Sequence, residues 1–443
     1  MARPIGVDLF AGVGGLSLGF EQAGFDVVAA VEYDSIHAAA HAYNFPNCAV
    51  LARSVVGLTG VEIRRAAGIG NQRVDVVFGG APCQGFSMIG QRVLDDPRNA
   101  LVREFVRIVS ELDADYFVFE NVKGLTLGPH RRFLEELIST FQDIGYQVRQ
   151  PWKVLNAVSY GTPQSRERLI LLGAKQGLAL PDYPTPSTVP ADAKVVPAGM
   201  TRGPSCADAL ADLPDAESFE ELLRSDEVRV DEWKSPSAYG AMMRCATPAA
   251  WHHGYRRKWD KHILSASTRS DHTPISRKRF ALTKPGKVEP ISRFFKLPPD
   301  GVANTLRAGS DAARGAFTSP RPIHYIYPRC ITVREMARLH GFPDWFRFHA
   351  TKWHGARQIG NAVPPPMARA IASSVLKAAA ITPEKPTRTI PPGALPLLHM
   401  DMSEASRFWG IAIPIGNRDR KSGNRKRKQS DIENAAPKEL HYA

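Results

Sequence analysis

The stretch IGVDLFAGVGGLSLGFEQA (residues 5–23) predicts a strand, a glycine-rich turn and a helix in immediate succession. The apolar run 5–10 has the composition of a buried strand, and residues 14–23 continue as a helix. The glycines between them allow the backbone to approach a bound ligand closely. Because doubly wound α/β sheets bind ligands at such a turn, we expect a nucleotide-like ligand here.

The spacing after this turn indicates the kind of ligand. Glu32 lies 20 residues after Gly12, at the end of the next apolar run, where an acid binds a ribose diol in Rossmann-type sites. The strict G-x-G-x-x-G pattern fails because Ser17 holds the third glycine position, and no phosphate-binding lysine follows. The ligand is then a nucleoside that need not carry a pyrophosphate, which favours S-adenosylmethionine (AdoMet) over NAD. An ordinary glycine turn remains the alternative at this point.

Three predicted strands each end in a side chain that can take part in chemistry. Residues 74–80, VDVVFGG, form an apolar run closed by two glycines that let the chain turn sharply, and Cys83 follows. The runs 27–31 and 116–119 end in Glu32 and Glu120. Because open α/β sheets place their chemistry at the carboxyl ends of strands, the three together predict an active site. A lone cysteine would more often be a small buried apolar residue.

Composition limits the class of protein. At 443 residues the chain can hold a large core and two domains, and its net charge of +13 weakly favours a polyanionic partner. The five cysteines show no C-x-x-C spacing, which argues against a structural zinc site or a disulfide framework and fits a reducing cytosol. No run approaches the ~20 apolar residues of a membrane span, and no signal peptide is evident. We therefore expect a cytoplasmic protein without membrane contact.

The pattern of apolar and polar residues changes along the chain. Up to about residue 175, apolar strands alternate with amphipathic helices, whereas prolines and short polar clusters dominate from there to about residue 328. The expected strands are 5–10, 27–31, 74–78, 116–119 and 168–173, and the expected helices are 14–23, 99–111, 131–144, 332–341 and 367–380.

Six motifs, in the same order, resemble those of the DNA (cytosine-5)-methyltransferase family. They are DLFAGVGG from Asp8, GGAPCQGFS from Gly79, ENV from Glu120, GTPQSRER from Gly161, TVREMARLHGFP from Thr332 and QIGNAVP from Gln358. The resemblance spans about residues 5–380 and excludes the middle domain, which varies in the family because it reads sequence. Six motifs in one order make coincidence negligible.

The resemblance implies a fold and a division into domains. We expect an α/β, Rossmann-like AdoMet-dependent methyltransferase domain at residues 1–175, completed by 354–382. A smaller, irregular target-recognition domain is expected at 176–353. Residues 383–443, with the basic run 418–428, are expected to form a largely disordered basic tail.

The resemblance also implies which residues bind AdoMet, at the glycine turn, the strand ends and the last motif. These residues are Phe10, Gly12, Gly14, Gly15, Glu32, Tyr33, Ser54, Pro82, Leu101, Asn361 and Val363. One of them departs from the family, which usually has an aspartate for the adenine amino group where this chain has Ser54. A hydroxyl can accept that hydrogen bond, but without charge assistance.

Catalysis is assigned by the resemblance to Cys83, Glu120, Arg166 and Arg168. Carbon 5 of cytosine is a poor nucleophile, and addition of the Cys83 thiolate at carbon 6 turns it into an enamine carbon that can attack a methyl group. Negative charge then develops toward N3, where Glu120 donates, and toward O2, which Arg168 holds with Arg166 beside it. Because Glu120 must be protonated to donate, we expect a dry pocket to raise its pKa.

DNA contacts are expected from two regions. The target base must leave the stacked duplex, and the loop after Cys83 would close over it. The middle domain would read the sequence, with arginine on guanine as a common contact. Solvated surface charge is the alternative for Arg92 and Arg98. The expected DNA-binding residues are Gln84, Ser87, Arg92, Arg98, Thr305 and Arg307.

We interpret the chain as a prokaryotic-type DNA cytosine-5 methyltransferase that acts as a monomer on double-stranded DNA and associates with the nucleoid when bound. Its expected role is protection of host DNA, with a restriction endonuclease acting separately. No metal is expected, since His252 and His253 have no partner ligands at suitable spacing. The same chemistry on RNA and a non-catalytic AdoMet-bound regulator remain alternatives. A cysteine hydrolase would need a motif histidine near these strand ends.

Overall fold

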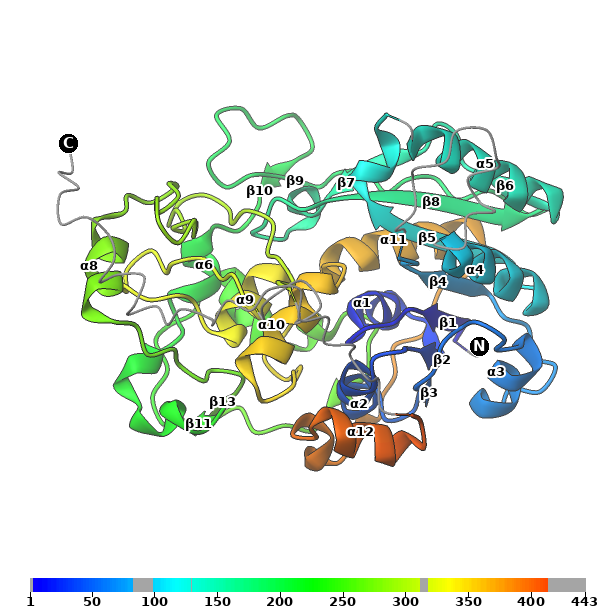
Figure 1. Ribbon diagram of the computed structural model, residues 1–443. Coiled ribbons are helices and arrows are strands. Elements are labelled where there is room, and N and C mark those ends of the chain that lie inside the picture. Colours follow the sequence, from blue (N-terminus) through cyan, green and yellow to red (C-terminus); the bar gives the residue numbers. More distant parts are fainter. Residues whose placement is uncertain (1–2, 83–98, 129, 311–317, 413–443) are drawn as a thin grey trace, which may run out of the picture.

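A computed structural model describes residues 3–82, 99–128, 130–310 and 318–412. Its centre is a sheet of strand order β3-β2-β1-β4-β5-β8-β6, in which β7 also pairs with β8 (Figure 1). The strands are β1 (Ile5–Leu9), β2 (Asp26–Val31), β3 (Ala49–Leu51), β4 (Val76–Gly79), β5 (Tyr116–Val122), β6 (Tyr146–Val148), β7 (Lys153–Asn156) and β8 (Glu167–Lys175). This is the α/β sheet that the sequence predicts.

Strand direction places the chemistry at one edge. The strands β3, β2, β1, β4 and β5 are parallel to their neighbours, so their carboxyl ends lie side by side. β8 is antiparallel to β5, and Val122 at the end of β5 lies opposite Arg168 near the start of β8. The amino end of β8 therefore joins the carboxyl ends of the parallel strands, where Glu32 and Glu120 lie.

Helices cover both faces of the sheet. α1 (Gly15–Ala23) and α11 (Pro365–Ala378) pack on one face, and α3 (Gly60–Ala67), α4 (Ala100–Glu111) and α5 (His130–Asp143) pack on the other. Side chains along β5 alternate accordingly, with Val118 in the first core and Phe117 in the second, where Phe117 stacks on Phe141. Burial of a phenylalanine of this kind contributes about 1.5–3 kcal/mol.

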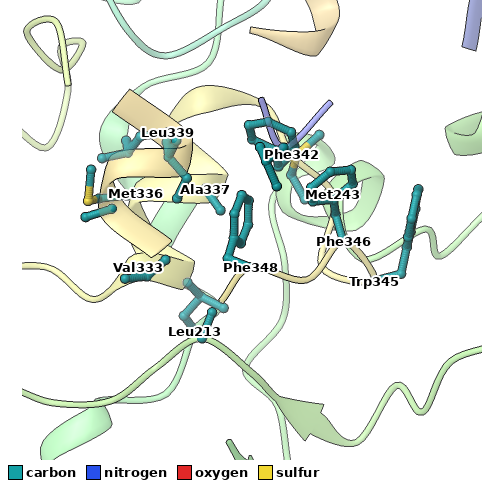
Figure 2. Close-up of a cluster of buried hydrophobic side chains, with 14 of the residues drawn as sticks. Leu213, Met243, Val333, Met336, Ala337, Leu339, Phe342, Trp345, Phe346 and Phe348 are labelled. Atoms are coloured by element: carbon teal, nitrogen blue, oxygen red, sulfur yellow. The ribbon is translucent and has the colours of Figure 1, made fainter. Parts of the chain in front are cut away.

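The middle of the chain forms a second lobe of short elements (Figure 1). They are β9 (Thr188–Val189), β10 (Thr201–Arg202), α6 (Cys206–Leu210), β11 (Val228–Arg229), α7 (Ala238–Met243), β12 (Arg256–Arg257), β13 (Ile263–Leu264) and α8 (Pro274–Leu282), followed by α9 (Val333–His340) and α10 (Lys352–Asn361). An aromatic cluster compensates for the short elements. Figure 2 shows Phe342, Phe346 and Phe348 packed together on the side of α9 that carries Ala337, and their ring centroids lie 4.7–5.3 Å from one another.

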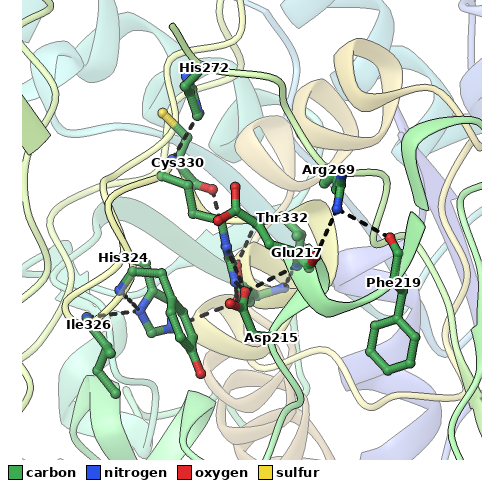
Figure 3. A network of polar contacts seen from close by, with 12 residues as sticks. Asp215, Glu217, Phe219, Arg269, His272, His324, Ile326, Cys330 and Thr332 are labelled. Carbon is green, nitrogen blue, oxygen red and sulfur yellow. Dashed lines mark hydrogen bonds and ion pairs between the residues drawn. The ribbon is translucent and has the colours of Figure 1, made fainter. Parts of the chain in front are cut away.

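Buried ion pairs also hold this lobe together. The Arg329 guanidinium donates to both carboxylate oxygens of Glu335, at 2.9 Å each, and to Asp215 at 3.1 Å. Glu335 also accepts from the backbone N–H of Thr332 and so completes a capping box at the start of α9. Figure 3 shows this network, with His324 approaching it from the neighbouring loop.

The expected disorder of residues 383–443 is wrong for residues 383–412. This segment forms β14 (Thr389–Ile390), which pairs with β12, a 3₁₀ helix (Leu395–Leu398) and α12 (Met402–Trp409). Leu398 is fully buried, and the Trp409 indole N–H donates to the Ser35 carbonyl at the start of α2 (Ser35–Asn44). Apolar packing outweighs the prolines here, whereas 413–443 lie outside the described residues.

Several boundaries differ from the expectations. β5 continues to Val122, so that Glu120 lies inside the strand and not after it. α2, α3, α10 and the short strands β3, β6 and β7 were not predicted. The three strands have only 3, 3 and 4 residues, too few for a clear alternation of apolar and polar positions. Within the described ranges, no helix has both the length and the apolar character that a membrane crossing requires.

Candidate active site and cofactor cleft

The glycine turn after β1 is fixed by Glu32. One Glu32 carboxylate oxygen accepts from the Gly12 backbone N–H at 2.8 Å, and the other accepts from the Asp34 N–H at 2.8 Å. Burial raises the pKa of Glu32, and the nearby His37 opposes this. Each oxygen keeps a lone pair for a further donor, so the carboxylate is positioned to accept from hydroxyl groups.

The turn itself needs glycine for two reasons. Phe10, Gly12 and Gly14 have positive φ, and at Gly14 a side chain would also collide with the Phe45 ring. A Cβ at the next residue, Gly15, would collide with the Val363 carbonyl. The last motif therefore packs directly on the first.

The remaining expected cofactor residues lie around this turn with different exposure. Tyr33 is 63% exposed and Val363 is 4% exposed. Asn361 is exposed at the end of α10, Pro82 is exposed after β4, and Leu101 is half-buried in α4. These positions surround the carboxyl edge of the sheet from several elements.

Ser54 follows β3 and is half-buried. Its hydroxyl oxygen accepts from the Val56 backbone N–H at 3.1 Å, which leaves one lone pair for another donor. Ser54 therefore presents a neutral acceptor at this position, already partly engaged.

Glu120 and Arg168 form an ion pair at the catalytic edge. The Arg168 Nε atom lies 2.8 Å from Glu120 Oε1, and each side chain is 13% exposed. A Cβ at Gly80 would collide with Glu120 Oε2. Neither Gly79 nor Gly80 has a positive φ, so the sharp turn that was expected here does not explain the glycines. Glycine is required at position 80 because the Glu120 carboxylate approaches so closely.

The electrostatics of Glu120 favour a proton. Burial raises its pKa, and the positive charges of Arg168 and Arg166 only partly oppose this. Next in β5, the Asn121 amide donates to the Ala81 carbonyl at 2.9 Å and so ties β5 to the start of the loop after β4. This edge of the sheet combines a buried acid whose affinity for a proton is raised with a guanidinium held beside it.

Arg166, which is expected beside Arg168, is buried and close enough to interact electrostatically with Arg168 and Glu120. It is 1% exposed, and its two terminal nitrogens donate to the carbonyls of Leu306 at 3.0 Å and Gly360 at 2.7 Å. Burial and the charge of Arg168 lower its pKa to about 9, so it stays charged at neutral pH. Both groups with which it bonds are backbone atoms far away in the sequence.

The expected DNA-reading residues that the structure describes lie near this edge. Thr305 and Arg307 are exposed, and the Thr305 hydroxyl donates to the Ser165 carbonyl at 2.8 Å. The segment therefore lies directly beside the motif that contains Arg166. Cys83, Gln84, Ser87, Arg92 and Arg98 lie outside the described residues.

Two buried residues at the site had no assigned role in the sequence. Gln164 and His340 are fully buried and hydrogen-bonded to each other at 2.9 Å. Both stand inside quoted motifs, and that placement was the available signal in the sequence. In the described part of the chain, no group of three or more His, Cys, Asp or Glu side chains is arranged to hold a metal ion.

Comparison with known proteins identifies the class. Residues 6–377 match the model of the family described as C-5 cytosine-specific DNA methylase. The chain belongs to this family of AdoMet-dependent enzymes, which methylate carbon 5 of cytosine in DNA, and the predicted family and Rossmann-like fold are confirmed.

Three individual proteins illustrate how similar this chain is to known members of the family. The chain is 56% identical over 415 residues to the Type II methyltransferase M.XorII of Xanthomonas oryzae, covering 94% of each chain. It is 32% identical to the Type II methyltransferase M1.HphI of Haemophilus parahaemolyticus, covering 84% of this chain and 86% of the relative. A crystal structure of a DNA modification methyltransferase encoded within an E. coli prophage has a TM-score of 0.69 at 32% identity, covering 85% of this chain and 100% of the other.

Proposed function

We propose that this chain is the modification enzyme of a restriction–modification system, and that it methylates one cytosine within a specific sequence of double-stranded DNA. The observation that carries the site assignment is the Glu120–Arg168 ion pair, on the same sheet edge as Glu32. The Type II relatives support the restriction–modification role. A restriction endonuclease would act separately, and the enzyme would work as a monomer in the cytoplasm, at the nucleoid when bound.

The two lobes would divide the work. Residues 1–175, completed by 354–382, would form the catalytic domain, and residues 176–353 would recognise the target. Thr305 and Arg307 would contact DNA, because both are exposed on a segment bonded to the catalytic motif. The loop residues Gln84, Ser87, Arg92 and Arg98 would contact DNA around the flipped base.

The residues at the sheet edge fit AdoMet. The Glu32 oxygens, fixed by two backbone N–H groups, keep lone pairs for the two ribose hydroxyls. Ser54 offers one lone pair to the adenine amino group, and Tyr33 offers an exposed ring beside it. Phe10, Gly12, Gly14, Gly15, Pro82, Leu101, Asn361 and Val363 would complete the site. When bound, AdoMet supplies an electrophilic methyl group.

Cys83 would begin the reaction by adding its thiolate to carbon 6 of the flipped cytosine. Glu120 would donate a proton toward N3 from Oε2, while its Oε1 stays paired with Arg168, and Arg168 would hold O2. Arg166 would add positive charge from its buried position. After methyl transfer, carbon 5 loses its proton to a base or water, the sulfur–carbon 6 bond breaks, and the Cys83 thiolate is released.

Bisulfite sequencing of host DNA with and without this gene tests the proposal. We expect 5-methylcytosine at one sequence motif with the gene present, and none at that motif when the gene carries Cys83→Ala. Absence of sequence-specific 5-methylcytosine in DNA would overturn the proposal. Methylation of RNA alone would move the same chemistry to another substrate.

A further inference from the structure

Arg166 is hydrogen-bonded to two segments, one proposed to bind DNA and the other proposed to bind the cofactor. One is residues 303–307, which hold the proposed DNA-reading side chains, and the other is residues 358–363, which hold proposed cofactor contacts. Arg166 donates to the Leu306 carbonyl and to the Gly360 carbonyl, at 3.0 Å and 2.7 Å, from a position that is 1% exposed. Charge-assisted bonds in a dry interior are strong and strongly directional.

A second chain of hydrogen bonds joins the same two segments. The Leu306 N–H donates to Gln164 Oε1 at 3.0 Å, so the Gln164 amide nitrogen faces His340 Nδ1 at 2.9 Å and donates to it. His340 Nδ1 is then the acceptor, and its Nε2 carries the hydrogen, which is donated to the Ala362 carbonyl at 3.0 Å. In this series of hydrogen bonds, the neighbouring group determines whether each side-chain atom donates or accepts.

The two segments have no room to move independently. A Cβ at Gly360 would collide with the backbone of Arg307 and Ala308. The Ser165 N–H donates to the Ala303 carbonyl at 2.8 Å, and the Thr305 hydroxyl donates to the Ser165 carbonyl. A displacement of the DNA-reading segment therefore has to strain or break buried bonds unless the cofactor segment moves with it.

We propose that His340 is a positioning residue that couples DNA binding at Thr305 and Arg307 to cofactor binding at Asn361 and Val363. This inference rests on the proposed function, which places DNA at the first pair and AdoMet at the second. Cognate DNA fixes the reading segment, and the hydrogen-bond chain transmits that order to the residues on either side of Ala362. Ordering of one segment then lowers the entropic cost of binding at the other.

The test measures the affinity of S-adenosylhomocysteine by calorimetry, with and without a duplex that carries the methylated sequence found in host DNA. For the wild-type protein we expect the duplex to tighten binding at least about fivefold. His340→Leu keeps the volume but removes both hydrogen bonds, and should reduce the effect of the duplex to below about twofold. His340→Gln offers an acceptor and a donor again and should restore it.

His349→Leu is the matched control. His349 is also buried, and its ring bonds to Thr351 and to the Met400 carbonyl in the C-terminal segment. Its one bond to the cofactor segment, to Gln358, comes from the backbone N–H and does not depend on the side chain. We expect His349→Leu to lower the melting temperature without changing the effect of the duplex. If His340→Leu does not fold, His340→Asn, which is too short to span both partners, is measured in the same way.

The outcomes separate the two proposals. Retention of the full duplex effect in a folded His340→Leu or His340→Asn variant would overturn the inference, as would a wild-type protein that binds S-adenosylhomocysteine equally with and without its duplex. A wild-type protein that binds no S-adenosylhomocysteine, or methylates no DNA, would overturn the proposed function itself.

Discussion

Glu335 in the recognition lobe and the two acids at the sheet edge, Glu32 and Glu120, show opposite pKa shifts although all three are buried. In the recognition lobe, burial works to raise the pKa of Glu335, but Arg329, held by two hydrogen bonds, lowers it to about 2. At the sheet edge, burial raises the pKa of Glu32 and of Glu120, and the neighbouring positive groups do not fully compensate. A matched buried acid is a structural ion pair, whereas an acid left short of positive charge marks a place where a proton or a ligand is to be taken up.

The largest expected effect comes from Glu120→Gln. The amide keeps the shape but cannot supply the proton at N3, so kcat should fall about 10²–10⁴-fold. Folding stability should be unchanged or higher, because burial disfavours the charge on Glu120 more than the two arginines favour it, which raises its pKa. Single-turnover methylation and urea unfolding measure the two quantities.

Glu167→Gln is the control for that change, since Glu167 neighbours the site on β8 but is 44% exposed and paired with Lys123. It should leave kcat within about twofold, as expected of a surface ion pair. Near wild-type activity of Glu120→Gln, or a clear loss of stability, would mean that Glu120 forms a structural ion pair as Glu335 does. The difference between the two acids would then be contradicted.

Glu335→Gln should show the reverse pattern. Among the described residues it leaves Arg329, in the interior, with Asp215 as its one carboxylate partner, and it should lower the free energy of unfolding by about 3 kcal/mol. Activity per folded molecule should be retained at low temperature. Differential scanning calorimetry and active-site titration measure these effects.

Glu404→Gln provides a matched comparison, because Glu404 completes the same kind of capping box in α12 but is exposed. It should cost no more than about 1 kcal/mol. Equal losses for the two variants would mean that the cap, and not the pairing of Glu335 with Arg329, stabilises α9.

The side chains near strand ends could be predicted from the sequence, whereas the partners of a buried side chain could not. Glu32 was placed correctly just after its strand, whereas Glu120 lies inside β5, near its carboxyl end. Both lie at the predicted edge because apolar runs and parallel pairing fix that edge locally. The partners of Arg166 could not be predicted, since Leu306 and Gly360 lie 140 and 194 residues away in the sequence. A motif arginine looks the same whether it contacts a ligand or a carbonyl group.

The C-terminal segment failed prediction for a related reason. Its prolines and basic residues suggested disorder, but Leu397 and Leu398 find an apolar partner surface on α2, more than 350 residues earlier in the chain. Local composition says whether a segment can fold alone, and does not say whether another element will cover it.

A third prediction uses pH. Burial raises the pKa of Asp8 in β1 from 3.8 to about 8, against the hydrogen bond from Ser17. Between about pH 4 and pH 8 the folded state holds one proton more than the unfolded state, so stability falls as pH rises through this window. Asp8→Asn should remove up to about 1 kcal/mol of this fall per pH unit, measured by urea unfolding from pH 5 to pH 8.

The control for Asp8 is the exposed Asp143, whose change to Asn should leave the slope as it is. Glu335 of the recognition lobe should give the opposite dependence of stability on pH. The depressed pKa of Glu335 gives a stabilisation that is present above about pH 4.5 and is lost as pH falls toward 2, the opposite sign. An Asp8→Asn slope that matches the wild type would mean that Asp8 is ionised in the folded protein.

The smallest expected effect adds an acid to the sheet edge. Ser54→Asp should tighten AdoMet binding by up to about 1 kcal/mol, because a carboxylate accepts from the adenine amino group with charge assistance. The same carboxylate can also accept from the Val56 N–H that Ser54 now binds. Calorimetry of AdoMet binding measures the gain.

Ser54→Asn separates charge from shape in that experiment, since its amide oxygen offers the same acceptor without the charge. If the edge is short of positive charge, the new carboxylate lowers the stability of the free protein more at pH 7 than at pH 4, and Ser54→Asn does not. Bound AdoMet should offset that loss through its adenine contact. A more than about tenfold loss of AdoMet affinity in Ser54→Asp would mean that Ser54 does not face the adenine, and that the acids of this edge serve the ribose alone.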